Sequence, residues 1–200
     1  LRTQKVAERF RGRPIISNDI TDEEKKQAAA LCPVGAIDPT KGSIDLGRCV
    51  FCNECAFALP DKIHFTNDYR IATNRREDLI IQPRGDLPLR LKESEIVPQI
   101  RTFFKGSLKL RQVSAGGDNS CEMELNAAGN VNFDMGRYGI EFVASPRHAD
   151  GIVITGPVSK NMVTALRITY DAVPDPKIII LVGTDAISGG LFADSPAIDR

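Results

Sequence analysis

Four of the five cysteines in this chain of 200 residues follow a spacing that constrains its fold more than any other feature. Cys49, Cys52 and Cys55 form a C-x2-C-x2-C run, and Cys32, followed by Pro33, lies 17 residues upstream of it. Thiolates are soft ligands, and three closely spaced thiolates can bind three corners of a cubane while a remote one binds the fourth. The spacing therefore predicts one [4Fe-4S] cluster bound by these four cysteines.

A second cluster is not expected in the same part of the chain. In bacterial ferredoxins such a run continues to a fourth cysteine before a proline, and that cysteine binds the other cluster. Here the continuing position holds Leu59, followed by Pro60. The positions that would accompany Cys32 hold Asp22, Lys25 and Ala28. Every ligand of one cluster is thus present, and every ligand of the other is replaced.

Two other interpretations of the cysteines remain open. Four cysteines can hold a zinc ion, although structural zinc sites usually pair two C-x2-4-C motifs rather than use a triple run. Disulfides fit less well because the odd count of five prevents a complete framework, which favours a reducing compartment. Val50, Phe51 and Phe57 flank the run and are expected to shield the cluster from water or to serve as ordinary core residues.

The chain is expected to form two domains. Residues 1–110 carry 19 Lys and Arg against 15 Asp and Glu, whereas residues 111–200 carry 7 against 11. From about Asp78 to Arg101, three prolines and one glycine are mixed with short apolar runs. This segment is expected to be partly extended and to link the domains. We expect an amino-terminal domain with its arm over residues 1–77, a linker over 78–105 and a second domain over 106–200.

Local signals predict elements in both domains. Thr21 and Glu24 form a capping box before a helix that should run into Cys32, and a short strand is expected at 44–46. In the second domain, strands are expected at 142–144, 151–156 and 177–183, the last of buried type.

A helix is expected between the last two strands of the second domain. Its apolar face would comprise Met162, Ala165, Leu166, Thr169, Tyr170 and Val173. Ser159 is its expected N-cap. Strand, helix and strand make a βαβ unit with a parallel pair. The turn at 155–159 lacks the Gly-rich fingerprint and the Lys-Ser/Thr pair of a phosphate-binding loop, so helix capping is favoured.

Two stretches of the sequence resemble known families. Residues 9–75, with Phe10-Arg11-Gly12-Arg13-Pro14, resemble the ferredoxin-type subunits of formate hydrogenlyase and complex I. Residues 106–195 resemble the small subunit of membrane-bound, energy-converting (group 4) [NiFe] hydrogenases and the 20 kDa subunit of complex I. The motifs that carry this second resemblance lie at 138–150, 155–162 and 174–177. The resemblance implies an α+β ferredoxin-like domain followed by an α/β, flavodoxin-like domain with a parallel sheet.

The second family binds a proximal [4Fe-4S] cluster, but its ligand positions are degenerate here. Alignment with the family motifs places Asp118, Cys121 and Asp185 at three ligand positions. The fourth belongs to a Pro-Gly-Cys-Pro segment expected beyond Arg200. Because carboxylates favour harder metals than iron–sulfur clusters contain, no normal second cluster is expected. Cys121 is then a small buried apolar residue or a remnant ligand, and the two Asp could form a carboxylate metal or proton site.

The resemblance also suggests residues that contact a partner. Glu124 matches a family Glu near proton-transfer chemistry, although an exposed helical Glu is the plain alternative. Arg147 and His148 are expected to face a catalytic large subunit, although a lone His is more often structural. The expected partners are a hydrogenase or complex I-type large subunit, membrane subunits, and a redox donor or acceptor protein.

We therefore expect an electron-transfer subunit of a membrane-associated redox complex, not a complete enzyme. The alternative is a scaffold or redox-sensing subunit whose hydrogenase-like half has lost its proximal cluster. Basic and acidic residues balance at 26 each, which gives no indication of nucleic-acid binding, and no apolar run reaches the ~18 residues of a membrane span. Residues 1–5 are not followed by the apolar segment of a signal peptide. A cytoplasmic location, peripheral on the inner membrane, is expected.

Overall fold

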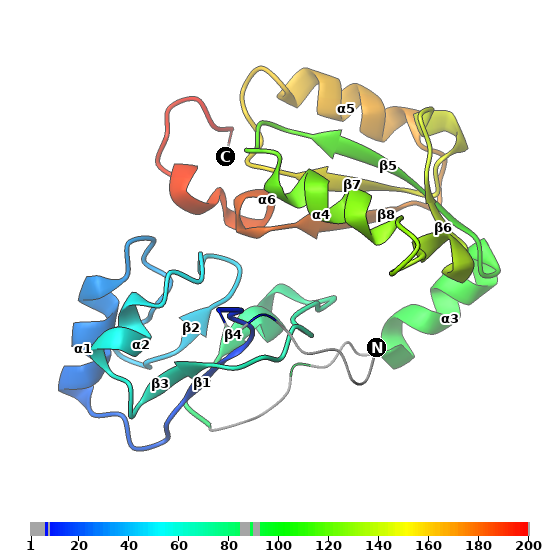
Figure 1. Cartoon of the computed structure of the whole chain (residues 1–200). Coiled ribbons are helices and arrows are strands. Elements are labelled where there is room, and N and C mark those ends of the chain that lie inside the picture. Colours follow the sequence, from blue (N-terminus) through cyan, green and yellow to red (C-terminus); the bar gives the residue numbers. More distant parts are fainter. Residues whose placement is uncertain (1–6, 8, 85–88, 90–92, 200) are drawn as a thin grey trace. The chain divides into compact units, whose positions relative to one another are not determined.

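The chain divides into two compact units, whose elements are labelled in Figure 1. Each unit has its own hydrophobic core. A computed structural model of the protein describes residues 7, 9–84, 89 and 93–199. Unit 1 comprises Leu1–Lys92 and unit 2 comprises Glu93–Arg200. The division falls inside the expected linker, of which residues 85–88 and 90–92 lie outside the described residues, as do residues 1–5 and Arg200. The domain boundaries at 77 and 106 stay predictions.

Unit 1 contains short strands and two helices. Strands β1 and β3 pair antiparallel, as do β2 and β4, and an isolated bridge joins Ile37 to Ile44. The elements in chain order are β1 (Pro14–Ile16), α1 (Asp22–Leu31), β2 (Ile44–Asp45), α2 (Glu54–Ala58), β3 (Ile63–Phe65), the 3₁₀-helix η1 (Arg76–Leu79) and β4 (Ile80–Ile81).

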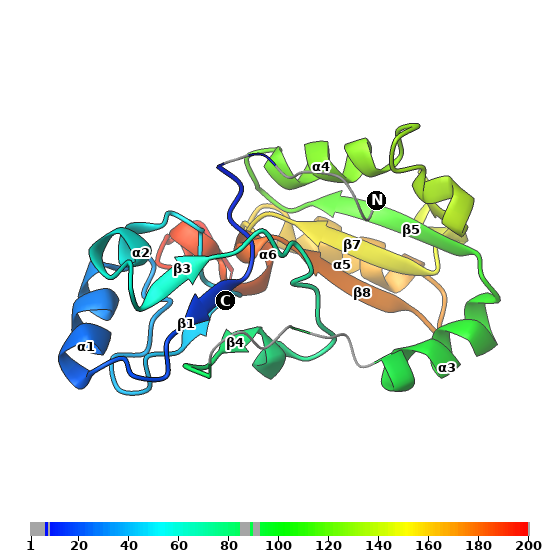
Figure 2. The ribbon, with the colours of Figure 1, turned by 60° about the horizontal axis from the view of Figure 1, so that its bottom comes forward.

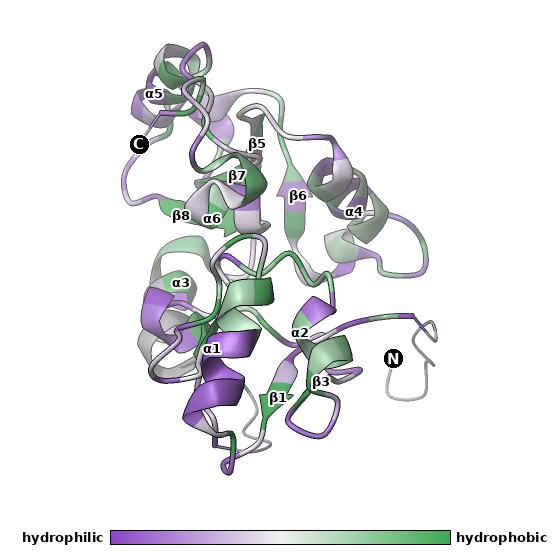
Figure 3. Ribbon diagram, turned by 90° about the vertical axis from the view of Figure 1, so that its left-hand side faces the viewer, coloured by the Kyte–Doolittle hydropathy of each residue, from purple (hydrophilic) through white to green (hydrophobic). Residues whose placement is uncertain are grey.

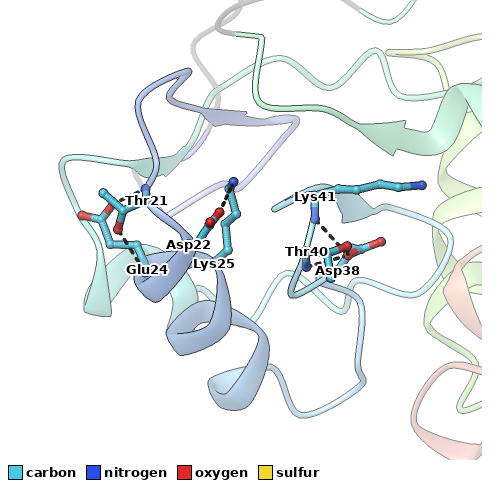
Figure 4. A network of polar contacts seen from close by, with 7 residues as sticks. All are labelled: Thr21, Asp22, Glu24, Lys25, Asp38, Thr40 and Lys41. Carbon is cyan, nitrogen blue, oxygen red and sulfur yellow. Dashed lines mark hydrogen bonds and ion pairs between the residues drawn. The ribbon is translucent and has the colours of Figure 1, made fainter.

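Helix α1 begins as the sequence predicts. The Thr21 hydroxyl accepts a hydrogen bond from the Glu24 backbone N–H (3.3 Å), and the Glu24 carboxylate accepts one from the Thr21 N–H (2.7 Å) (Figure 4). Acidic residues fill the first turn, where the positive end of the helix dipole favours them. The predicted helix and its capping box are therefore confirmed.

Ile16, Ile44 and Ile63 form the centre of the core of unit 1, each at most 1% exposed. Cys49 and Cys55 belong to the same buried cluster. Helix α1 is mostly hydrophilic and α2 mostly apolar (Figure 3), which agrees with the deeper position of α2.

Unit 2 has a four-stranded parallel sheet with the strand order β6-β5-β7-β8. The α/β architecture with a parallel sheet predicted for this half is thus confirmed. The elements in chain order are α3 (Glu93–Phe104), β5 (Leu108–Ser114), α4 (Ser120–Ala128), η2 (Met135–Tyr138), β6 (Ile140–Phe142), η3 (Pro146–His148), β7 (Gly151–Thr155), α5 (Val163–Ala172), β8 (Ile178–Val182), α6 (Thr184–Ser188) and η4 (Gly190–Phe192).

The sheet lies between helices, with α4 on one face and α5 on the other (Figures 2 and 3). The chain leaves β5 toward β6 on one side and leaves β7 toward β8 on the other, so the strand order reverses between β5 and β7. Ser114, Thr155 and Val182 are in register at the carboxyl ends of their strands. Ligands of open α/β sheets bind outside the carboxyl ends at such a switch point.

Two expectations about unit 2 were wrong. Helix α5 begins at Val163 after Met162, so Ser159 is not its N-cap; the Ser159 N–H instead bonds to the Ala115 carbonyl (2.9 Å). Strand β8 lies at the sheet edge, with Ile179 51% exposed, although its apolar run indicated a buried strand. Helix α3, which contains Pro98, lies within the segment 78–105 that is expected to link the domains, and this linker stays a prediction. Within the described residues, no helix combines the length and apolar character that crossing a bilayer requires.

Candidate metal centre

The four predicted cysteine ligands line one cavity in unit 1. Cys32 directly follows α1, Cys49 and Cys52 lie in the loop before α2, and Cys55 lies in the first turn of α2. Cys49 and Cys55 are buried, and Cys32 and Cys52 are partly exposed. Cys32 and the three cysteines that lie 17 or more positions after it are thereby brought to one cavity.

Apolar side chains form most of the remaining wall, which would exclude water from a bound group. The lining includes Val34, Ala36, Ile37, Ile44, Val50 and Phe65. Two of the three residues expected to shield the site are near it: Val50 lines the cavity, and Phe51 packs on Phe65 with ring centroids 5.8 Å apart. Phe57 is 73% exposed, because it lies on the outer side of the five-residue helix α2, so that expectation was wrong.

Backbone N–H groups point at the cysteine sulfurs. The Ala36 N–H lies 3.2 Å from the Cys32 sulfur, and the Phe51 N–H lies 3.4 Å from the Cys49 sulfur. Both Phe51 and Asn53 have positive φ angles (54° and 77°), which bends the loop around the cavity. Hydrogen bonds of this kind stabilise thiolate ligands and tune an iron–sulfur centre.

The turn that leads into Cys49 is fixed by Asp45. Its carboxylate accepts hydrogen bonds from the Gly47 N–H (2.8 Å) and from both terminal nitrogens of Arg76 (2.7 and 2.5 Å). The Asp45 carbonyl also accepts the Cys49 N–H (2.9 Å). A bidentate Arg–carboxylate pair has defined geometry, so the direction in which the chain enters the cysteine loop is well determined.

Burial, and to a smaller extent repulsion from the neighbouring thiols, raises the pKa of Cys49 to about 12 and that of Cys55 to about 11. These two thiols are therefore protonated near neutral pH in the absence of a cation. Because only thiolates bind iron, ligation must release these protons.

Within the described residues, no three His, Cys, Asp or Glu side chains are grouped so as to hold a single metal ion.

The positions that would hold a second ligand set are occupied by helix α1. Asp22 and Lys25 lie in its first turns and form an ion pair at 2.8 Å (Figure 4), and Ala28 is fully buried. Leu59 is buried in the core of unit 1. Residues 22–26 correspond in the ligand spacing to residues 49–53 of the cysteine loop. Residues 49–53 form a loop with two left-handed residues, whereas residues 22–26 are helical. A capped helix thus replaces the loop that a second cluster would need.

The degenerate positions of unit 2 gather at the carboxyl end of its sheet. Asp118 follows β5, Cys121 lies in the first turn of α4, and Asp185 follows β8 in α6. Burial raises the pKa of Asp185, and the charge of Asp118 raises it further. Burial also raises the pKa of Cys121. Its sulfur packs closely on Gly183, since a Cβ atom added at Gly183 would lie only 2.6 Å from it. Two carboxylates beside one thiol make a poor donor set for an iron–sulfur cluster.

The remaining candidate residues are Glu124, one helical turn after Cys121 on α4, and the pair Arg147 and His148. Glu124 is exposed on α4, and Arg147 and His148 are exposed in η3, which precedes the amino end of β7. Strand β7 extends roughly 13 Å from there to its carboxyl end. The structure therefore does not bring Arg147 and His148 together with Asp118, Cys121 and Asp185.

Sequence reasoning missed Glu122, which is 7% exposed at the switch point. Its carboxylate accepts a hydrogen bond from the buried Thr155 hydroxyl (2.5 Å). Burial alone would raise its pKa, but the Ser114 and Thr155 hydroxyls together hold the pKa of Glu122 below its ordinary value. Glu122 lies one helical turn before Leu125 on α4, a spacing that could have placed it on the sheet-facing side.

Comparison with known proteins agrees with the motifs of the second half. Residues 119–200 match the family of the 20 kDa subunit of NADH ubiquinone oxidoreductase. A probable membrane-bound hydrogenase subunit of Pyrococcus furiosus is 36% identical over 100 residues, which cover 50% of this chain and 60% of that protein. A NADH-quinone oxidoreductase subunit of Desulfovibrio desulfuricans is 46% identical over 72 residues, covering 36% of this chain and 39% of that protein.

A solved chain of an archaeal membrane-bound sulfane sulfur reductase, a respiratory membrane complex, is 29% identical with a TM-score of 0.44; the match covers 52% of this chain and 56% of that one. The chain thus spans 60% or less of the length of these relatives. Over residues 119–200 the chain is similar to the family of the NADH ubiquinone oxidoreductase 20 kDa subunit and to membrane-bound hydrogenase subunits, the resemblance that its motifs predicted.

Proposed function

We propose that this chain is an electron-transfer iron–sulfur subunit of a membrane-associated redox complex related to hydrogenases and complex I. Unit 1 would hold one [4Fe-4S] cluster through Cys32, Cys49, Cys52 and Cys55. The observation that carries the proposal is that four thiols from two separate segments line one apolar cavity. When bound, such a cluster accepts and donates single electrons.

The residues of the cavity fit this group. Four thiols supply the soft donors, and the N–H groups of Ala36 and Phe51 face two of the sulfurs. Apolar neighbours such as Val50 and Phe65 keep water from the site. The apolar wall and the hydrogen bonds to sulfur are the two features of the protein that would set the potential of the centre.

The topology of unit 1 supports a ferredoxin-like domain. In the first half, strand β1 leads into α1 and then to the bridge residue Ile37. In the second half, the bridge residue Ile44 leads to α2 and then to β3, so the unit consists of two similar halves. The pairing of β1 with β3 joins the outer ends of the halves, and the bridge between Ile37 and Ile44 joins the inner ends. Cys32 follows the helix of the first half, whereas the other three ligands surround the start of the second helix.

Membership in a larger assembly is supported by the relatives, whose names describe subunits of a membrane-bound hydrogenase and of a NADH-quinone oxidoreductase. The partners would be a large subunit, membrane subunits, and a donor or acceptor protein. The exposed Glu124, Arg147 and His148 are available for contacts with such partners. We propose that the chain itself is non-catalytic and is peripheral on the cytoplasmic face of the membrane.

A second function is favoured by one specific observation in unit 2. Asp118, Cys121 and Asp185 offer a single thiol where the family uses cysteines, so we propose no second cluster there. An electron path through unit 2 would then be interrupted, and the chain would act as a scaffold or a redox sensor. In that case the cluster of unit 1 would stabilise the fold or report the redox state.

Electron paramagnetic resonance on the isolated subunit and on its native complex separates the two functions. Under reductant and under turnover with the natural donor, an electron carrier must show a cluster signal that appears and disappears as electrons pass. A cluster whose redox state stays constant while the complex turns over would exclude the carrier function and leave the scaffold.

A further inference from the structure

The segment Arg11-Gly12-Arg13 is bound along the chain that follows β3. The Gly12 N–H donates to the Thr66 carbonyl (2.7 Å), and the Arg13 N–H donates to the Asp68 carbonyl (2.9 Å). The approach is so close that a Cβ on residue 12 would lie 2.2 Å from the Asp68 carbonyl oxygen, which explains the glycine. Arg13 is 3% exposed and lies 3.6 Å from the Asp68 carboxylate. The backbone that directly follows Arg11 is therefore well fixed.

From this fixed backbone, Arg11 reaches the cysteine loop. Its guanidinium donates a hydrogen bond of 2.5 Å to the carbonyl of Phe51, which is 40 residues away in the sequence. Phe51 lies between Cys49 and Cys52, so the contact is made within the ligand loop itself. Arg11 is exposed to solvent, and its charge faces the loop without a carboxylate in this contact.

Phe51 has a conformation that needs support from its surroundings. Its φ angle of 54° is in the left-handed region, which is unfavourable for a residue with a bulky side chain. Three contacts hold it: its carbonyl accepts from Arg11, its N–H points at the Cys49 sulfur (3.4 Å), and its ring packs on Phe65. The same turn that Arg11 stabilises thus aims an N–H at a ligand sulfur.

We propose that Arg11 is a positioning residue for the cluster: it holds the left-handed turn of the ligand loop and raises the reduction potential with its positive charge. This inference rests on the proposed function. A cluster becomes more negative when it accepts an electron, so a nearby cation stabilises the reduced form. Because Arg11 is exposed, the charge effect must weaken as salt is added.

The test compares Arg11→Gln, Arg11→Lys and the wild type in the full chain. Redox titration followed by electron paramagnetic resonance gives the potential, and the rate of iron loss to a chelator reports how firmly the loop holds the cluster. For Arg11→Gln we expect the reduced-to-oxidised ratio at a fixed potential to fall at least threefold, about 30 mV for one electron. Iron loss should be severalfold faster. Arg11→Lys keeps the positive charge but lacks the planar guanidinium group. Its reduction potential should be close to that of the wild type, whereas its rate of iron loss should lie between those of the wild type and Arg11→Gln.

Arg9→Gln is the matched control, because it removes an exposed charge from the same arm two residues earlier. It should leave both readouts near the wild-type values. An Arg11→Gln protein with wild-type potential and iron loss would overturn the inference while leaving the proposed function intact, and so would an equal shift in Arg9→Gln. If Arg11→Gln cannot load the cluster although its circular dichroism is unchanged, the positioning role is supported. A wild type without any cluster would instead refute the proposed function.

Discussion

Glu122 links three elements of unit 2 through hydrogen bonds. It lies on α4, and its carboxylate accepts from Thr155 on β7 while Ser114, at the end of β5, also bonds to it. Thr155 is fully buried, and the Glu122 carboxylate is the nearer acceptor of its hydroxyl, at 2.5 Å against 3.5 Å for the Val113 carbonyl. A hydrogen bond of this kind contributes about 1 kcal/mol to stability. The position that family motifs emphasise, Glu124, is exposed and has no such role in the fold.

Glu122→Gln should destabilise unit 2 by about 1 kcal/mol at neutral pH, because the charged acceptor forms the stronger hydrogen bonds. The folded-state pKa of Glu122 is lowered, so this stabilisation is present above the ordinary pKa of Glu and is lost as pH falls through the folded value. Urea denaturation at several pH values should therefore show a difference in unfolding free energy between wild type and variant that disappears in acid. The charge of Asp118 opposes the shift but does not reverse it.

Glu124→Gln provides the control for this prediction, since it makes the same chemical change two residues away on the exposed side of α4. Its stability should equal that of the wild type within about 0.5 kcal/mol. If the difference in unfolding free energy between wild type and Glu122→Gln stays constant from neutral to acidic pH, the charge of Glu122 does not contribute to stability.

At the scale of elements, helix α1 depends on its first turn. The capping box of Thr21 and Glu24 satisfies N–H groups that the helix leaves free, and the helix replaces the loop that a second cluster would need. Thr21→Ala should lower the free energy of unfolding of unit 1 by about 1 kcal/mol. Thr164→Ala, on the exposed surface of α5, removes no cap and should change stability little in the same denaturation experiment. Equal effects of both changes would contradict the account of α1.

Strand β8, at the edge of the sheet, presents alternate side chains, those of Ile179 and Leu181, to solvent on one face. Ile179 is 51% exposed, whereas Ile152 on the central strand β7 is 1% exposed. Ile179→Lys should therefore cost less than about 1 kcal/mol in unfolding free energy, and Ile152→Ala should cost about 2–5 kcal/mol. Thermal or urea unfolding of the two variants decides this, and a larger loss for Ile179→Lys would show that the edge is covered.

Elements with local signals could be predicted from the sequence, and those set by tertiary position could not. The start of α1 is visible because its cap and its partner lie three residues apart. The apolar run of β8 shows only that its residues are apolar; whether a further strand lies beside it depends on the topology. The start of α5 was misplaced because Ser159 is taken up by a turn that pairs with the end of β5.

At the scale of the whole molecule, the two units carry different kinds of information. In unit 1 the spacing of Cys32, Cys49, Cys52 and Cys55 was enough to predict a common site, since ligation chemistry fixes the spacing. It could not reveal that Phe65 lines the cavity or that Arg11 contacts the ligand loop, because both contacts depend on how β1 and β3 pair. In unit 2 the degenerate ligand positions could be found only through family resemblance.

Quantification of iron, sulfide and zinc, combined with electron paramagnetic resonance of the dithionite-reduced chain, tests the central claim most directly. The account predicts about four irons and four sulfides per chain with no stoichiometric zinc, and the signal of one reduced [4Fe-4S] cluster. Cys49→Ala should lose the intact cluster, whereas Cys121→Ala should keep it. Zinc in place of iron, or a loss of iron in Cys121→Ala equal to that in Cys49→Ala, would contradict a single cluster bound by the four cysteines of unit 1.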